Sequence, residues 1–278
     1  MRHGLSLLGG LLLCASVARA QEPPELEPDG VETDCADAVA EALAIVGTLS
    51  VPAPPGDPEP VVEEPIADPL PPPRPAPPGV PSGRAVANLS AEACTAILEA
   101  HHIPFHPLDP SEAEGVDIPI RLDGPVAGVR VESRGHSELH EIVDCRLAVA
   151  VLAWSPSLRE AGVEALLHYS TYRPGARVAT TGRRSGHAGA LAIDLAVVRM
   201  DDGTEHEILN AWEARERGAP PCEGGYDEGP DSARLRRLVC DVASTELFQV
   251  VLTPHFDAAH GNHVHLELRP GVAWQYLR

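Results

Sequence analysis

No segment of this 278-residue sequence is apolar over the length that a helix needs to span a membrane. Basic residues are also few: 21 of them (Lys plus Arg) face 41 acidic residues, for a formal net charge of −20. Nucleic acid binds to basic surfaces, so it is not an expected partner. None of the six cysteines stands in a CxxC pair, which argues against a thiolate metal site. We expect a soluble monomer without a transmembrane segment.

The first twenty residues have the layout of a secretory signal peptide. Arg2 and His3 form a basic start, an apolar stretch runs from Leu5 to Leu13, and Ala18-Arg19-Ala20 is a small-x-small cleavage site. The apolar stretch is too short for a transmembrane helix. We therefore expect cleavage after Ala20 and a secreted or periplasmic protein.

Five cysteines remain after this cleavage, and an exported chain permits disulfides. We expect Cys94 to pair with Cys145 and Cys222 with Cys240, which leaves Cys35 unpaired. Spacing does not fix connectivity, so other pairings stay open.

The rest of the chain divides into three parts. Residues 21–50 contain one short alanine-rich helix, over 33–47, that ends at Gly47. Residues 51–85 form a linker with fourteen prolines between Val51 and Pro81. Such a segment buries no core and is expected to be a disordered, extended spacer, with a partner-binding motif as the alternative. Residues 86–278 are long enough for one well-buried domain.

Within this domain, apolar periodicity and capping residues predict mixed helices and strands. Ser90 caps a helix over 91–100, and Ser155-Pro156 is read as the start of a separate helix after one over 145–153. A further helix is expected over 233–242, and strands over 163–169, 191–198, 248–252 and 263–268. Asp201-Asp202-Gly203 predicts a hairpin turn. The expected fold is α+β, with a small, mainly antiparallel sheet and flanking helices.

Four histidines fall between His255 and His265. His263 and His265 alternate with apolar residues, so in a strand both imidazoles lie on one face and the apolar side chains on the other. Burial of the apolar face would hold the imidazoles rigidly, as a metal site requires. Taken alone, the His-x-His pair is a weak signal, because such a pair is more often two surface or hydrogen-bonded histidines.

A second polar segment, SGHAGALAID, occupies residues 185–194. His187 lies in a loop of small residues, and Asp194 stands inside the apolar strand that follows. A carboxylate there is costly unless it is paired or binds a cation. A salt bridge to Arg183 or Arg184 is the alternative to metal binding.

Two histidines and one carboxylate, with a fourth position open, form a ligand set of catalytic zinc. The two segments together supply such a set. We therefore predict one Zn²⁺ site formed by His187, Asp194 and His265.

The motif S-x-H-x-x-A-x-A-x-D, followed downstream by H-x-x-H-x-H, resembles the zinc peptidases of the D-alanyl-D-alanine carboxypeptidase and penicillin-insensitive murein endopeptidase group. A nearer resemblance is to the bacterial extensin-like C-terminal domain family, over roughly residues 91–278. It implies the hedgehog/D-Ala-D-Ala-peptidase-like fold. Its matching segments occur here in the same order, at Cys145–Trp154, His168–Pro174, Ser185–Asp194 and Ala258–His265.

The resemblance assigns the zinc ligands to His187, Asp194 and His265. It makes His263 a general base or transition-state donor that faces the metal water, with His260 as a supporting residue. It places Arg173 against the developing oxyanion, whereas Ser185 orients the loop or the substrate. Zinc would polarise the carbonyl and lower the pKa of its water in amide hydrolysis.

Two positions depart from this pattern. Ala190 stands where the group usually has glycine, a difference that a small backbone shift would absorb. Asn262 stands where the carboxypeptidases have a catalytic glutamate and extensin-like proteins an aspartate, and an amide cannot take up a proton. Any base must therefore be His263 or His260.

We thus expect an exported zinc metallopeptidase of the carboxypeptidase or endopeptidase type, acting on peptide amide bonds of peptidoglycan or its stem peptides. One alternative is a zinc-containing module that binds cell-wall material without cleaving it. Another is a structural protein in which the histidines and the aspartate are polar packing.

Overall fold

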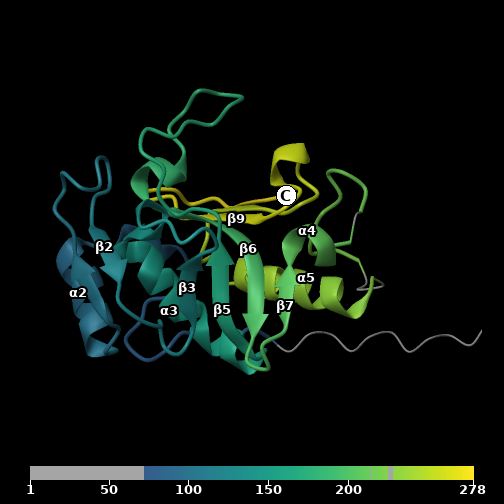
Figure 1. The fold of residues 1–278 in the computed structure, drawn as a ribbon, viewed down its shortest axis with the longest axis horizontal. Helices are drawn as coiled ribbons and strands as arrows, with labels where there is room; N and C mark the ends of the chain where they lie inside the picture. Colours follow the sequence, from purple (N-terminus) through teal and green to yellow (C-terminus); the bar gives the residue numbers. More distant parts are fainter. Residues whose placement is uncertain (1–71, 214, 225–227) are drawn as a thin grey trace, which may run out of the picture. The chain divides into compact units, whose positions relative to one another are not determined.

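The computed structural model describes residues 72–213, 215–224 and 228–278 (Figure 1). The expected signal peptide, the helix over 33–47, Cys35 and most of the linker lie outside these residues. Within them, no helix combines the length and the apolar character needed to cross a membrane.

A seven-stranded sheet forms the centre of the fold, in the order β10-β8-β9-β6-β5-β3, with β7 paired to β6 (Figure 1). Two pairs, β10–β8 and β3–β5, are parallel, and the other pairings are antiparallel. The strands are β3 (Arg130–Ser133), β5 (Val163–His168), β6 (Ala192–Met200), β7 (Glu205–Glu207), β8 (Val250–Leu252), β9 (Val264–Glu267) and β10 (Tyr276–Leu277). The four predicted strands correspond to β5, β6, β8 and β9.

A second, antiparallel sheet has the order β1-β2-β4 and was not predicted. Its strands are β1 (Phe105–Pro107), β2 (Pro119–Leu122) and β4 (Ile142–Asp144). Each has only three or four residues, which is too few for a clear alternating pattern. The α+β class is confirmed.

Four α-helices accompany the sheets in the described part of the chain: α2 (Ala91–Ala100), α3 (Cys145–Glu160), α4 (Ile208–Ala211) and α5 (Pro230–Ser244). Short 3-10 segments are η1 (Gly83–Asn88), η2 (Leu139–Glu141), η3 (Gly186–Gly189) and η4 (Ala258–His260). Apolar residues of α3 and α5 share one core with one face of the large sheet. Away from this core, β6 carries Asp194 and β9 carries His265 and Glu267, and a small apolar cluster of β5 and β6 lies apart from the main core (Ala165, Leu167, Ala196 and Val197).

The prediction of a helix boundary at Ser155-Pro156 is wrong. The helix α3 continues through both residues to Glu160. Pro156 has no N–H to donate to the carbonyl of Leu152. The Ser155 hydroxyl donates to this carbonyl instead, at 2.8 Å, so the acceptor stays satisfied and the helix continues.

Both predicted disulfides are present. Cys94–Cys145 joins α2 to the first residue of α3, and Cys222–Cys240 joins a surface loop to α5. The predicted cap of α2 is also confirmed, because the Ser90 hydroxyl accepts a hydrogen bond from the Ala93 N–H at 3.2 Å.

The hairpin between β6 and β7 forms as predicted. Met200 N–H donates to the Thr204 carbonyl at 2.8 Å, and Gly203 takes the positive φ of 85° that the turn requires. The second strand of the hairpin, β7, ends at Glu207, because α4 begins at Ile208. Before the predicted domain start at residue 86, Arg74 ion-pairs with Glu160 of α3 and Val80 is buried.

Candidate metal centre

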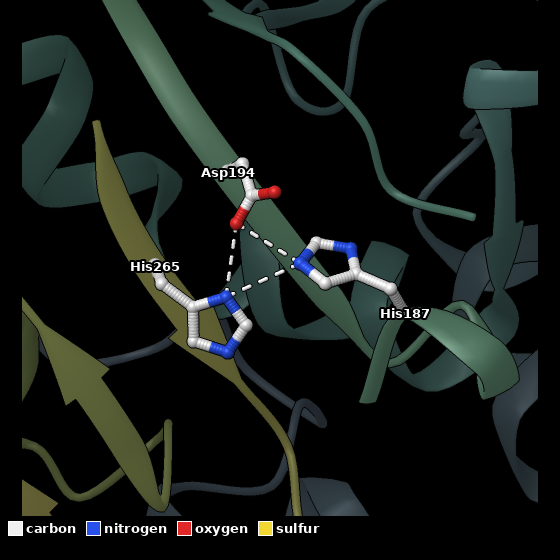
Figure 2. Close-up of side chains that lie close together, drawn as sticks. All are labelled: His187, Asp194 and His265. Carbon is white, nitrogen blue, oxygen red and sulfur yellow. Dashed lines mark hydrogen bonds and ion pairs between the residues drawn. The ribbon is translucent and has the colours of Figure 1, made fainter. Parts of the chain in front are cut away.

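Three buried side chains converge on one point above the large sheet (Figure 2). The Asp194 Oδ1 atom lies 2.9 Å from His187 Nε2 and 2.9 Å from His265 Nδ1, and the two ring nitrogens are 3.2 Å apart. No other group of three or more His, Cys, Asp or Glu side chains among the described residues converges in this way. The structure thus brings together the three residues that the sequence analysis selected as ligands.

The register of two strands positions two of these side chains. Antiparallel pairing of β6 with β9 sets Asp194 opposite His265, so both side chains leave the same face of the sheet. Apolar neighbours on these strands, such as Ile193 and Leu266, point to the other face and are buried in the main core. The alternation predicted for His265 is therefore the feature that places it.

The short segment η3 delivers the third side chain, His187, from before β6. The Ser185 hydroxyl caps it by accepting a hydrogen bond from the His187 N–H. Ala190 ends it at a φ of 51°, in the left-handed region that glycine adopts at lowest cost. The methyl group of Ala190 is fully buried, which offsets part of this cost of about 1 kcal/mol.

Both imidazoles are held from behind. His187 Nδ1 lies 3.1 Å from the Thr171 carbonyl, and His265 Nε2 lies 2.9 Å from Glu267 Oε2. Each histidine thereby donates its outer N–H and turns its other nitrogen to the centre. A histidine held in this way is typical of metal ligands, because the outer partner fixes the tautomer and the ring orientation.

Glu267 is a residue of the centre that the sequence analysis missed. It is 3 % exposed, and it follows His265 by two residues on the same face of β9. The alternating pattern of His263, His265 and Glu267 was the available signal. A Cβ at Gly186 would collide with the Glu267 carboxylate, so the glycine before His187 makes room for this contact.

The charges of the centre suit a cation. Burial raises the pKa of Asp194, but hydrogen bonds with His187 and His265 outweigh burial and hold this pKa well below its usual range. Burial lowers the pKa of His187. Burial also opposes charge on His265, but hydrogen bonds to Asp194 and Glu267 raise its pKa to about 9. An ion bound by the three would replace the proton that Asp194 and His265 share.

The spacing of the donor atoms also fits an ion. A tetrahedral ion with bonds of about 2.0 Å separates its ligand atoms by about 3.3 Å. The separations of 2.9 and 3.2 Å need to widen by only a few tenths of an ångström. His187, Asp194 and His265 could therefore hold a metal ion.

A groove of about 490 Å³ runs past Asp194 and His265. All the residues to which the sequence analysis gave a catalytic role line it: Arg173, His260 and His263. An ion held by the three ligands therefore faces a space that a substrate can enter.

His263 lies beside the ligands and is fixed by Asn262. Its Nε2 is 3.4 Å from Asp194 Oδ1, and its Nδ1 is 2.8 Å from the Asn262 amide oxygen. Because this oxygen accepts, Nδ1 carries the proton and Nε2 is left as an acceptor facing the centre. Burial lowers the pKa of His263 to about 4, so the imidazole is neutral at pH 7.

His260 has a carboxylate partner on its Nδ1 atom, where His263 has the Asn262 amide. Its Nδ1 lies 2.6 Å from Asp257 Oδ1, and the same oxygen accepts the His260 backbone N–H. The rings of His260 and His263 have centroids 5.1 Å apart. Asp257 was not a predicted site residue, because it caps η4 from outside the H-x-x-H-x-H motif.

Arg173 approaches the carboxylate of the centre from the groove. Its side chain is half exposed, and Nη2 lies 3.5 Å from Asp194 Oδ2. Its backbone N–H donates to the His187 carbonyl at 3.0 Å, which ties this residue to η3. A guanidinium in this position can bind an anionic oxygen that stands beside the ion.

Comparison with known proteins places this geometry in a family. The family model described as extensin-like protein C-terminus matches residues 92–278, which include the whole centre. No curated protein and no solved structure gives a significant match. Because the match covers most of the sequence, the chain belongs to the extensin-like protein C-terminus family.

Proposed function

We propose that this protein is an exported zinc-dependent hydrolase that cleaves peptide amide bonds of peptidoglycan, as a carboxypeptidase or an endopeptidase. One observation carries the proposal: the two imidazoles and the carboxylate converge at the edge of an open groove. A purely structural polar cluster has no need of such a groove. The choice of peptidoglycan as substrate rests on the resemblance of the sequence motifs to those of zinc peptidases that act on it.

Zinc is the ion that the donor set favours. Catalytic zinc sites use three protein ligands, with histidine nitrogen and carboxylate oxygen among them, and leave one position open. Magnesium and calcium prefer all-oxygen sites, and the described residues bring only one carboxylate to the three-residue centre. A bound zinc ion would supply Lewis-acid polarisation of the carbonyl and a water of lowered pKa.

The residues around the ion have separate roles in proton transfer and in stabilising negative charge. His263 accepts a proton at Nε2, because Asn262 keeps the proton of the ring on Nδ1. His260, held by Asp257, stands behind it as the second proton carrier on the path to the leaving amine. Arg173 donates to the oxygen that becomes negative when the carbonyl is attacked.

Export is part of the proposal. Two disulfides in the described residues fit an extracellular protein, since such bonds persist in oxidising compartments. The basic and apolar pattern of residues 1–20 is the reason to propose a cleaved signal peptide and a periplasmic or secreted location.

A cell-wall-binding module that holds zinc without turnover is the second candidate. It is favoured by Asn262, because the amide replaces the carboxylate that the related enzymes use. In that case His263 and Arg173 orient bound wall peptide, and no bond is broken.

Digestion of purified sacculi by the zinc-loaded protein tests the proposal. New muropeptides in chromatograms, absent with His187→Ala and strongly reduced with His263→Ala, are the expected result. Sacculi that bind the protein but release no new fragments would exclude the hydrolase and leave the binding module. Activity that survives in His187→Ala would exclude the metal mechanism altogether.

A further inference from the structure

The segment that ends in β10 alternates strictly between exposed and half-buried side chains. Trp274, Tyr276 and Arg278 are exposed, whereas Gln275 and Leu277 turn inward. Trp274 is 51 % exposed and Tyr276 40 %, which makes them two of the four large apolar side chains that stand out among the described residues. The outward side chains of this edge strand therefore form an aromatic stripe, which we define as Trp274 and Tyr276.

The stripe lies on the same face of the sheet as the metal centre. Parallel pairing sets Tyr276 beside Val250, and antiparallel pairing sets Val250 opposite Glu267. Neighbours in register share a face, so Tyr276 points to the side that carries Glu267 and His265. Since β10 is two strands from β9, and strands lie about 4.8 Å apart, the Tyr276 backbone is about 10 Å from that of Glu267, its neighbour in register, and farther from that of His265, which lies two residues along β9.

A shallow hollow lies at the stripe and next to the groove. It has a volume of about 390 Å³, and its lining consists of Val250, Trp274, Gln275 and Tyr276. Val250 and Tyr276 also line the groove at the metal centre, so the two spaces are neighbours. No charged side chain lines the hollow, in contrast to the groove with its arginines, histidines and carboxylates.

We propose that the aromatic stripe binds a sugar ring of the peptidoglycan glycan strand, next to the amide bond held at the metal centre. This inference rests on the proposed function. An N-acetylated pyranose is uncharged, and the C–H groups on its ring face give it an apolar surface that packs on exposed aromatic rings. Stem peptides carry carboxylates, which an uncharged apolar hollow does not recognise.

The distance between the two sites agrees with this ligand. An extended peptide covers about 10 Å with about three residues. A glycan on the stripe therefore places at the metal centre a bond that lies at least about three residues along the attached stem peptide. The stripe thereby selects peptides that are still attached to sugar.

Calorimetric titration of the full-length protein with the uncharged chitin tetrasaccharide tests the proposal. We expect saturable binding, weakened about tenfold by Trp274→Ala and by Tyr276→Ala. Leu209→Ala is the matched control, because Leu209 is 55 % exposed on α4 and lines neither the hollow nor the groove. No saturable binding by the wild type, or equal binding by Trp274→Ala, would overturn the proposal. The proposal would also be overturned if Trp274→Ala and Tyr276→Ala weakened the binding of a free stem peptide but not that of the tetrasaccharide.

The same titration on chelator-treated protein separates this inference from the proposed function. Packing on the aromatic rings needs no metal, so sugar binding should persist after the zinc is removed. If the protein binds the tetrasaccharide but leaves sacculi intact, the proposed hydrolase activity is refuted and sugar binding by the stripe is supported. If the protein hydrolyses sacculi but does not bind the tetrasaccharide, the proposed hydrolase activity is supported and sugar binding by the stripe is refuted.

Discussion

Glu267 Oε2 lies 2.9 Å from His265 Nε2, on the side of the imidazole that faces away from Asp194. The carboxylate is almost fully buried, and its other oxygen faces Arg269. His265 is therefore held between two carboxylates, one at the candidate metal position and one behind it. A carboxylate behind a histidine ligand fixes the ring and makes its metal-binding nitrogen more basic.

Replacing Glu267 with glutamine should weaken zinc binding by about tenfold to a hundredfold, because the isosteric amide removes the charge behind His265. Competition with a chromophoric chelator measures the affinity. Glu205→Gln serves as the control, since Glu205 is an exposed residue of the β6–β7 hairpin. Unchanged affinity in Glu267→Gln would show that the outer carboxylate does not support the site.

Gly186→Ala should weaken zinc binding in the same assay by about tenfold, because the new methyl group displaces the Glu267 carboxylate. Gly189→Ala is a closely matched control within η3. Its Cβ would meet its nearest atoms at 3.6 Å, which is ordinary contact. Equal effects of the two alanines would point to a general disturbance of η3 and contradict the specific role of Gly186.

Asn262→Asp should raise the rate of amide hydrolysis by about tenfold or more and leave zinc content unchanged. A carboxylate at this position accepts the Nδ1 proton of His263 more strongly and makes Nε2 a better base. Asn262→Leu removes the acceptor and should lower the rate. Both rates are measured on the same muropeptide under saturating zinc. A rate that does not respond to either change would remove His263 from the proton path.

His168 should make the protein sensitive to acid. Burial lowers its pKa to about 4, whereas the unfolded chain has the ordinary value of 6.5. Between these values the unfolded chain binds the extra proton, so the contribution to stability is complete above pH 6.5 and is lost as pH falls toward 4. The loss is about 2.5 kcal/mol by about pH 4.5.

Urea unfolding at about pH 7.5 and about pH 4.5 measures this difference. His168→Phe should show a smaller drop in unfolding free energy between the two conditions than the wild type. His106→Phe should keep the wild-type drop, because His106 is exposed. A wild-type drop in His168→Phe would place the acid sensitivity elsewhere.

The sequence predicts best those elements whose pattern is both long and local. The helix α2 follows its cap at Ser90, and α5 follows its apolar face, although it begins three residues before the predicted range, at Pro230. The continuation of α3 was unpredictable from propensity, because the bond from the Ser155 hydroxyl compensates the proline locally. Strands as short as β1 or β10 receive their structure from pairing partners far along the chain.

The residues of the candidate site also fall into a group that the sequence predicts and a group that it does not. His187, Asp194 and His265 were predictable because each residue type is unusual where it stands, in a small-residue loop or an apolar strand. Glu267 and Asp257 were not selected, since a single acidic residue near a motif is common. Only the side-chain geometry, with contacts of 2.9 Å to His265 and 2.6 Å to His260, gives these carboxylates a role.

Metal analysis of the protein purified without added chelator shows directly whether His187, Asp194 and His265 bind zinc. Mass spectrometry of the digested protein should find about one zinc per chain in the wild type. His187→Ala, Asp194→Ala and His265→Ala should each lose nearly all of it, while His106→Phe retains it. Zinc binding at this centre would be contradicted by a folded wild-type protein that binds no zinc even after zinc is supplied. It would also be contradicted if any of these three alanine variants kept its full zinc content.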